Sequence, residues 1–154
     1  MDIVFRKASV GDKATIENLF IEMLQSVYHT EKVDGYEKDY LYRFFDVSDD
    51  CIIVAELNNA VIGYISIVVN LEGDQYAYID DFCVTKEYRN LSIGTQLLQC
   101  AEDFAKNINI SDIRLHVENK NTSAQNLYRK NGYEFLKAEG SRSLMKKRLE
   151  ILKD

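Results

Sequence analysis

Proline and tryptophan are absent from this chain of 154 residues, and cysteine and histidine are rare, with three and two residues. Because no proline-rich stretch, low-complexity tract or internal repeat marks a linker, we expect one domain over residues 1–154. Cys51, Cys83 and Cys100 are odd in number and are never spaced as C-x-x-C. This pattern predicts free thiols in a reducing compartment rather than a disulfide framework or a zinc site. We therefore expect a cytoplasmic protein that holds no metal.

A basic surface and a long hydrophobic run are also missing. The longest apolar run, residues 61–71, is interrupted by Gly63, Ser66 and Asn70, and it falls short of the ~18 residues of a membrane helix. The first residues are too polar for a signal peptide. With 19 Lys and Arg against 25 Asp and Glu, the formal net charge is −6, whereas a nucleic-acid-binding protein needs cations to neutralise phosphates. We expect neither a membrane nor a nucleic acid as a partner.

The hydrophobic residues that are present, 46% of the chain, change their spacing along it. Apolar residues three and four apart predict helices, and alternating ones predict strands. The expected elements are, in chain order, a strand at 3–8, a helix capped by Ser9 and Asp12, a second helix from Asp34 to Phe45, strands at 51–57 and 61–71 joined by an Asn58-Asn59 turn, a strand at 76–84, a helix from Gly94 to Ile108, a strand at 113–117, a helix capped by Thr122 and Gln125 that ends at Gly132, and strands at 133–136 and 143–149. This order predicts an α/β protein with a mixed sheet and helices on both faces.

Two segments stand out as candidates for chemistry. Residues 84–98 read as a strand end, a polar loop and a helix start, and the exposed N–H groups of a helix start bind phosphates well. Arg89 adds a cation there, and Gly94 allows close approach of a ligand to the main chain. Taken alone, this segment is equally well read as an ordinary connection. The second segment, residues 115–135, is a strand followed by a capped helix and a glycine turn.

Together these segments resemble the Gcn5-related N-acetyltransferases (GNAT). The family's acetyl-CoA loop reads Gln/Arg-x-x-Gly-x-Gly/Ala, and this chain has Arg89-Asn90-Leu91-Ser92-Ile93-Gly94. The family's later motif reads Asn-x-x-Ala-x-x-Leu-Tyr-x-Lys-x-Gly-Phe, matched here by Asn121, Ala124, Leu127, Tyr128, Lys130, Gly132 and Tyr133. Ser92 departs from the pattern, because it stands where the family usually has a glycine. The resemblance covers nearly the whole chain and implies a GNAT-like, mostly antiparallel sheet of about seven strands with helices on both faces.

The resemblance implies an acetyl-CoA-dependent N-acetyltransferase that acts on a primary amine by direct transfer in a ternary complex. It assigns cofactor binding to Phe82, Cys83, Val84, Arg89, Asn90, Leu91, Ser92, Ile93, Gly94, Thr95, Asn121, Ala124 and Tyr128. Tyr128 also matches the family's general acid, since a phenol is protonated at neutral pH and can donate a proton to a departing thiolate. Without the resemblance, Tyr128 would be read as a packed core tyrosine. A covalent route through Cys83, the cysteine nearest to the motif, is a minor alternative.

Asp80 and Asp81 are adjacent in a predicted strand, where aspartate is unusual. Neighbours in a regular strand point to opposite faces, so one of the two can face a cleft. Several members of the family carry Glu-Asp at this place, and by that similarity we expect Asp80 to accept the proton of the amine through a water. The alternative is that one aspartate is exposed and the other pairs with a Lys or Arg.

The acceptor is expected to be a small cationic metabolite or a peptide amine. The family places its substrate-selecting loop between the first two helices, which corresponds here to residues 28–42, a stretch rich in tyrosines and acids. Such groups suit a cation, although a solvated helix face would look the same. The competing interpretation is a CoA-binding sensor without catalysis, which Ser92 mildly favours. Members of the family are often dimers, so a homodimer is a further expectation.

Overall fold

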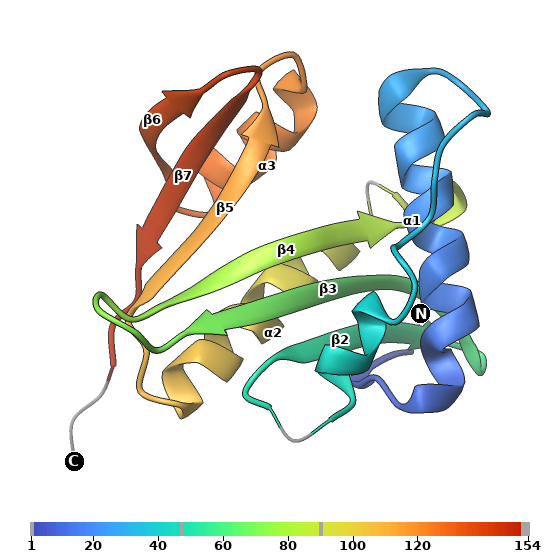
Figure 1. The fold of residues 1–154 in the computed structure, drawn as a ribbon, viewed down its shortest axis with the longest axis horizontal. Coiled ribbons are helices and arrows are strands. Elements are labelled where there is room, and N and C mark those ends of the chain that lie inside the picture. Colours follow the sequence, from blue (N-terminus) through green and yellow to red (C-terminus); the bar gives the residue numbers. More distant parts are fainter. Residues whose placement is uncertain (1, 47, 90, 152–154) are drawn as a thin grey trace. The chain divides into compact units, whose positions relative to one another are not determined.

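The computed structural model describes residues 2–46, 48–89 and 91–151. Its elements are β1 (Ile3–Lys7), η1 (Val10–Asp12), α1 (Lys13–Tyr28), η2 (Tyr40–Phe44), β2 (Cys51–Leu57), β3 (Ala60–Asn70), β4 (Tyr76–Val84), η3 (Lys86–Tyr88), α2 (Ile93–Asn107), β5 (Asp112–Glu118), α3 (Thr122–Lys130), β6 (Glu134–Glu139) and β7 (Arg142–Arg148), where η marks a 3-10 helix. Seven strands form one sheet in the order β1-β2-β3-β4-β5-β7-β6 (Figure 1). The pair β4–β5 is parallel, whereas β1–β2, β5–β7 and β6–β7 are antiparallel. The predicted mixed, mostly antiparallel sheet is confirmed.

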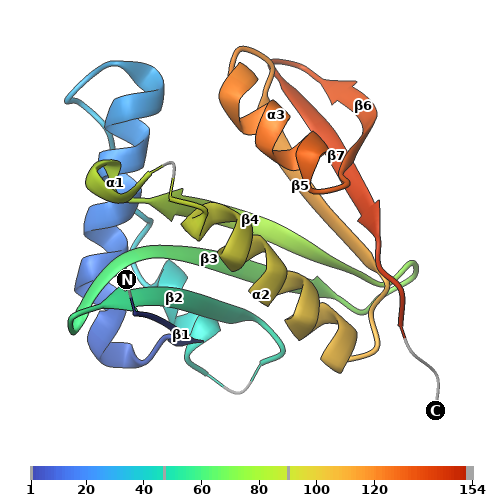
Figure 2. The same cartoon turned by 180° about the vertical axis from the view of Figure 1, so that it is seen from behind.

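The chain divides into two compact units, and the first comprises Met1–Ser66 and Asp81–Cys100. Within it, β1 pairs with β2 from Ile3 opposite Leu57 to Lys7 opposite Ile53. Helix α2 lies behind strands β2 to β4 in Figure 1 and in front of them in Figure 2, on the face opposite to η2. The first unit therefore has helical segments on both faces of its strands, and its strands carry buried residues on both sides, among them Val54, Ala55, Tyr64 and Ile65.

The second unit comprises Ile67–Asp80 and Ala101–Asp154. Its strand β5 alternates as predicted, with Ile113, Leu115 and Val117 buried and the residues between them partly exposed. Helix α3 covers one face of β5 and β7 (Figure 2). The buried carboxylate of Glu102 accepts hydrogen bonds from Tyr133 Oη at 3.0 Å and from Lys147 Nζ at 2.8 Å. This buried charge is thus both paired and hydrogen-bonded, as burial requires.

Local turn signals in the sequence are confirmed. Asn58 and Asn59, between β2 and β3, have φ of 50° and 67°, which suits the tight hairpin turn that asparagine tolerates. Gly132 follows α3 with φ of 93°, a conformation in which a side chain would be strained. Asp12 Oδ2 accepts a hydrogen bond from the amide of Ser9 at 2.8 Å, as the capping spacing predicted.

Two expectations about helices are wrong. The predicted helix from Asp34 to Phe45 is only the short 3-10 helix η2, because Asp39 takes a left-handed φ of 67° that interrupts any helix. The N-cap of α3 is Asn121, whose Oδ1 accepts the amide of Ala124 at 3.1 Å, and not Thr122. Gln125, the other member of the expected pair, instead donates its side-chain amide to the main-chain oxygens of residues 118 and 119.

Candidate active site

The connection from β4 to α2, predicted to hold phosphate, lies in the first unit. The amide of Gln96 donates to the carbonyl of Ser92 at 3.1 Å, which leaves the amides of Ile93, Gly94 and Thr95 in the first turn, ahead of the helical hydrogen bonds. Ser92 has φ of 65°, the left-handed conformation that glycine adopts without cost. Ser92 therefore has the backbone conformation typical of the glycine that it replaces. Leu91 is exposed and Ile93 is buried.

Asn90, also expected to bind the cofactor, lies outside the described residues. Its neighbour Arg89 donates Nε to the carbonyl of Val84 at 3.0 Å. This bond folds the arginine back over the end of β4, while the planar guanidinium still has two terminal nitrogens with which to meet an anion.

The end of β4 consists of Phe82 and Val84, which are partly exposed, and the buried Cys83 between them. A Cβ on Gly63 of β3 would lie 2.9 Å from the carbonyl oxygen of Cys83, so glycine permits the close approach of the main chain here. Burial raises the pKa of the Cys83 thiol. A thiol that stays protonated is a poor nucleophile, which disfavours the covalent route through Cys83.

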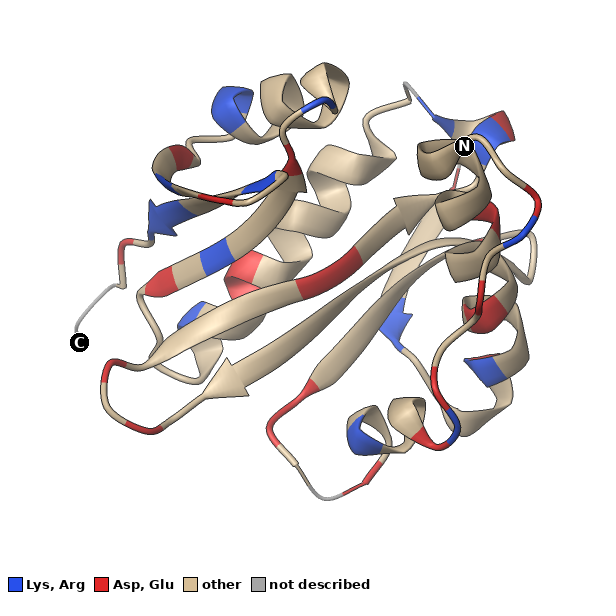
Figure 3. Cartoon of the chain, turned by 45° about the horizontal axis from the view of Figure 1, so that its top comes forward, with Lys and Arg blue, Asp and Glu red and all other residues tan. Residues whose placement is uncertain are grey.

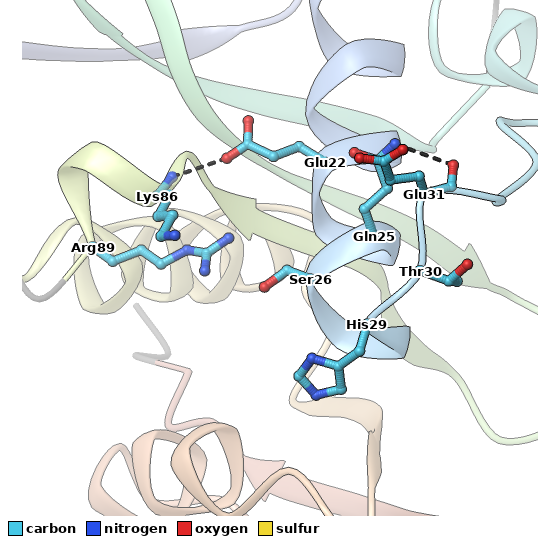
Figure 4. A pocket seen from close by; sticks show the side chains of 8 residues that line it. All are labelled: Glu22, Gln25, Ser26, His29, Thr30, Glu31, Lys86 and Arg89. Atoms are coloured by element: carbon cyan, nitrogen blue, oxygen red, sulfur yellow. Dashed lines mark hydrogen bonds between the residues drawn. The ribbon is translucent and has the colours of Figure 1, made fainter.

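A pocket of about 430 Å³ adjoins this connection, lined by Glu22, Gln25, Ser26, His29, Thr30, Glu31, Lys86 and Arg89 (Figure 4). Glu22 of α1 accepts hydrogen bonds from the amide of Lys86 at 3.0 Å and from Thr85 Oγ1 at 3.1 Å. Glu22 thereby ties α1 to the start of the loop that leads to α2. No local pattern in the sequence marks Glu22, because its partners are more than 60 positions away.

The two adjacent aspartates of β4 form an acidic stretch in the middle of the strand (Figure 3). Asp81 Oδ2 accepts a hydrogen bond from Tyr36 Oη at 2.6 Å, and the amide of Asp81 donates to Ser66 Oγ at 2.9 Å. Asp80 belongs to the second unit and follows the parallel pairing of Ala77–Ile79 with Ile113–Leu115. The two carboxylates therefore differ in surroundings, and Asp81 has a phenol as a partner.

Helix α3 of the second unit carries the remaining predicted residues. Asn121 and Ala124 form its N-terminal cap, so both have a structural role there. Tyr128 is buried, and its ring meets that of Tyr133 edge-on with centroids 6.0 Å apart. Burial raises the pKa of Tyr128, so its phenol is protonated at neutral pH, as a proton donor must be.

One series of hydrogen-bonded side chains was not expected from the sequence, and it crosses β4, β5 and β6. His116 Nδ1 lies 2.5 Å from Tyr78 Oη, and His116 Nε2 lies 2.7 Å from Glu139 Oε2. Because a carboxylate only accepts, a neutral His116 carries its proton on Nε2 and accepts the Tyr78 hydroxyl proton on Nδ1. The signal was present in the alternation: Tyr78 pairs with Arg114, which places His116 on the same face two residues later.

The described residues contain neither a metal-ligand cluster nor a membrane-spanning helix. In this part of the chain, no group of three His, Cys, Asp or Glu side chains is arranged to hold a metal. No helix in the same residues has the length and apolar character needed to cross a bilayer.

A mixed sheet whose fourth strand leads into a helix start is the arrangement that the resemblance to the GNAT acetyltransferases implies. Comparison with known proteins agrees, since the model of the acetyltransferase (GNAT) family matches residues 17–133. The chain belongs to this family.

Relatives and solved structures extend the likeness over most of the chain. An N-acetyltransferase of Methanocaldococcus jannaschii is 31% identical over 132 residues, which are 85% of this chain and 78% of that protein. An N-alpha-acetyltransferase of Sulfurisphaera tokodaii is 27% identical over 86% of this chain and 87% of its own length. The PaiA N-acetyltransferase of Thermoplasma acidophilum, solved in complex with coenzyme A, has a TM-score of 0.77 at 23% identity and covers 96% of this chain and 99% of its own. The last likeness concerns the fold.

Proposed function

We propose that the protein transfers the acetyl group of acetyl-CoA to a primary amine by direct transfer in a ternary complex. The observation that carries this proposal is the start of α2, where Ser92 takes a left-handed φ of 65° in a chain of the GNAT family. The coenzyme A complex of the Thermoplasma protein supports acetyl-CoA as the cosubstrate. Acetyl-CoA supplies an activated thioester carbonyl, which the amine attacks.

The residues of the first unit fit this cosubstrate. The first-turn amides of Ile93, Gly94 and Thr95, with the main chain of Leu91 and Ser92, offer donors and the positive end of a helix dipole to a diphosphate. We assign Arg89 and Asn90 to the same group and the main chain of residues 82–84 to the pantetheine arm. From the second unit we assign Asn121, Ala124 and Tyr128.

Two protons must move during the transfer. The amine has to be neutral to attack, and we propose Asp80 as the acceptor of its proton through a water. The chain from Tyr78 through His116 to Glu139 is a second candidate, because its geometry lets Tyr78 pass a proton to His116 Nδ1. We propose Tyr128 as the donor to the departing thiolate, since burial keeps its phenol protonated.

The acceptor is a peptide amine or a small cationic amine. The name of the Sulfurisphaera relative, an N-alpha-acetyltransferase, favours the amino terminus of a peptide. The exposed carboxylates of Glu31, Asp34 and Glu37 favour a cation near residues 31–39. We place the reaction in the cytoplasm and expect a homodimer.

The test is release of CoA thiol from acetyl-CoA in the presence of polyamines, aminoglycosides, amino acids and peptides with free amino termini. Turnover of at least one amine is expected. Tight acetyl-CoA binding in calorimetry without turnover on any amine would instead favour the sensor, and no binding would contradict the proposal as a whole.

Variants then identify the residue that donates one proton and the residue that accepts the other. Tyr128→Phe should lower kcat by roughly a hundredfold, as loss of a general acid does, while the Kd of acetyl-CoA changes little. Tyr133→Phe is the matched control, since it removes another buried hydroxyl of the same unit and should leave kcat unchanged. Between Asp80→Asn and His116→Gln, the variant that abolishes the acidic limb of the pH–rate profile identifies the base. If Asp80→Asn leaves kcat and the profile unchanged, Asp80 is not the base.

A further inference from the structure

A hydrogen-bonded chain in the first unit connects segment 31–39 to strands β3 and β4. Tyr36 Oη lies 2.6 Å from Asp81 Oδ2 and 2.7 Å from Tyr64 Oη. Tyr64 is fully buried. The amide of Asp81 donates to Ser66 Oγ at 2.9 Å. The side chain and the main chain of Asp81 are thus each held by a separate partner.

The direction of these hydrogen bonds follows from the number of protons that each group carries. The Asp81 carboxylate can only accept, so Tyr36 donates its single proton to it. Tyr36 must then accept from Tyr64. Burial raises the pKa of both phenols, so both protons are present at neutral pH. The two hydrogen bonds therefore have one direction, from Tyr64 to Tyr36 and from Tyr36 to the Asp81 carboxylate.

The ring of Tyr36 is packed against other aromatic rings. It stacks on Phe20 of α1 with centroids 3.9 Å apart and on Tyr40 of η2 at 5.3 Å. With two rings stacked on it, Tyr36 is a packed side chain and not an open aromatic surface for a cation. Segment 31–39 has no helix or strand of its own, and this one side chain ties it to elements on both sides.

Two of the hydrogen-bonded residues lie at the boundaries of the first unit. Ser66 is the last residue of β3 in the first unit, and Asp81 is the first residue of β4 in it. Asp80, the proposed base, is bonded covalently to Asp81. A restraint on Asp81 therefore fixes the direction of the main chain on which Asp80 is carried.

We propose that Tyr36 and Asp81 are positioning residues of the acetyl transfer, which hold β4 so that Asp80 is correctly placed, and that Asp81 does not itself accept the proton. This inference rests on the proposed function. It follows from the hydrogen bonds of Asp81, whose Oδ2 accepts from Tyr36 Oη and whose amide donates to Ser66 Oγ. The reaction it serves needs a base held within a fraction of an ångström of its working position.

Kinetics of three variants test the proposal. Tyr36→Phe keeps the ring stack and removes the hydroxyl, and Asp81→Asn removes the charge that Tyr36 binds. Each should lower kcat about five- to tenfold, the effect of a slightly misplaced base, with the KM of acetyl-CoA and the shape of the pH–rate profile unchanged. Because both break the same hydrogen bond, the double variant should be no slower than the slower single variant. Tyr76→Phe, which changes a partly exposed tyrosine at the start of β4, is the matched control and should behave as the wild type.

Hydrogen exchange gives a readout that needs no turnover. Amides of segment 31–39 should exchange roughly threefold faster or more in Tyr36→Phe than in Tyr76→Phe, since a local restraint is lost. A wild type that turns over no amine would contradict the proposed function, whereas unchanged exchange would contradict the restraint. Additive losses in the double variant, or loss of the acidic limb in Asp81→Asn, would overturn the positioning role. If Asp81→Asn does not fold, Tyr36→Phe alone decides through its kcat and its exchange.

Discussion

Ser92 has a conformation that its side chain disfavours. A left-handed φ of 65° costs a residue with a Cβ of order 1 kcal/mol, and the strain lies in the loop that leads into the proposed diphosphate site. Strain of this kind persists where the surrounding structure dictates the backbone. Sequence analysis identified Ser92 as the departure from the family's pattern, and the structure shows that the backbone keeps the form of a glycine.

Ser92→Gly should therefore relieve strain without altering the loop. We expect the free energy of unfolding to rise by up to about 0.5 kcal/mol, because relief of the left-handed strain is partly offset by the greater freedom of glycine in the unfolded chain. The affinity for acetyl-CoA should be equal or higher. Ser92→Ala is the matched control, as it removes the hydroxyl and keeps the strain, and it should resemble the wild type in urea unfolding and calorimetry. Weaker binding in both variants would mean that the hydroxyl, not the backbone, is what the cosubstrate needs.

For other single residues, the hydrogen-bond partners could not be predicted from the sequence. The pair Asp80 and Asp81 was recognisable as unusual, but the partner of Asp81 is Tyr36, 45 positions earlier. His116 bridges Tyr78, 38 positions before it, and Glu139, 23 positions after it. Hydrogen bonds between residues distant in sequence leave no local pattern, so these roles required the three-dimensional arrangement.

At the scale of the elements, Arg6 of β1 is hydrogen-bonded to residues of both β2 and η1. Its guanidinium bonds both carboxylate oxygens of Asp12, at 2.8 and 3.0 Å, and Glu56 Oε2 at 2.8 Å. The hydrogen bond from Arg6 is the main cause that lowers the pKa of Asp12 to about 2. A carboxyl group whose pKa is depressed in the folded state stabilises the fold above its ordinary pKa, and this stabilisation is lost as the pH falls toward the depressed value.

Arg6→Gln should show this dependence. At pH 7 we expect a loss of about 1 kcal/mol in the free energy of unfolding, discounted for the partial exposure of the arginine. As the pH falls from about 4 to about 2, Asp12 becomes protonated in the wild type as well, so the difference should shrink. Urea titrations at pH 7 and pH 2.5 measure both values. Arg148→Gln, which removes an exposed arginine from β7 and changes the net charge equally, is the control; a loss independent of pH would show that Arg6 acts by packing.

The elements themselves were predictable to the extent that their causes are local. Strand β4 has the predicted bounds, and the Asn58-Asn59 turn and the Gly132 terminus follow from residues that tolerate positive φ. The helix expected from Asp34 to Phe45 failed, because segment 31–39 is shaped by the stack of Tyr36 on Phe20 and by its bond to Asp81. Tertiary contacts of this strength override a helical spacing of apolar residues.

Over the whole chain, we predict that the two compact units do not behave as separable domains. Their boundaries fall after Ser66, Asp80 and Cys100, and each of these lies inside a regular element, β3, β4 or α2. Neither unit can unfold without ending a strand or helix that continues into the other. The chain is therefore expected to behave as the single domain that its composition predicts, although domain boundaries normally fall in flexible linkers.

A single cooperative transition is the corresponding prediction. Urea unfolding followed by far-UV circular dichroism and by tyrosine fluorescence, for which the chain has 10 tyrosines and no tryptophan, should give coincident curves. Acetyl-CoA at a hundredfold excess over its Kd should raise the free energy of unfolding by about 2.7 kcal/mol for every probe. Amide exchange resolves the units separately: equal stabilisation in β5 and in β2 supports one domain, because the ligand acts on a shared unfolding equilibrium. Two transitions, or protection confined to one unit, would show that the interrupted elements break at the boundaries and that the units unfold independently.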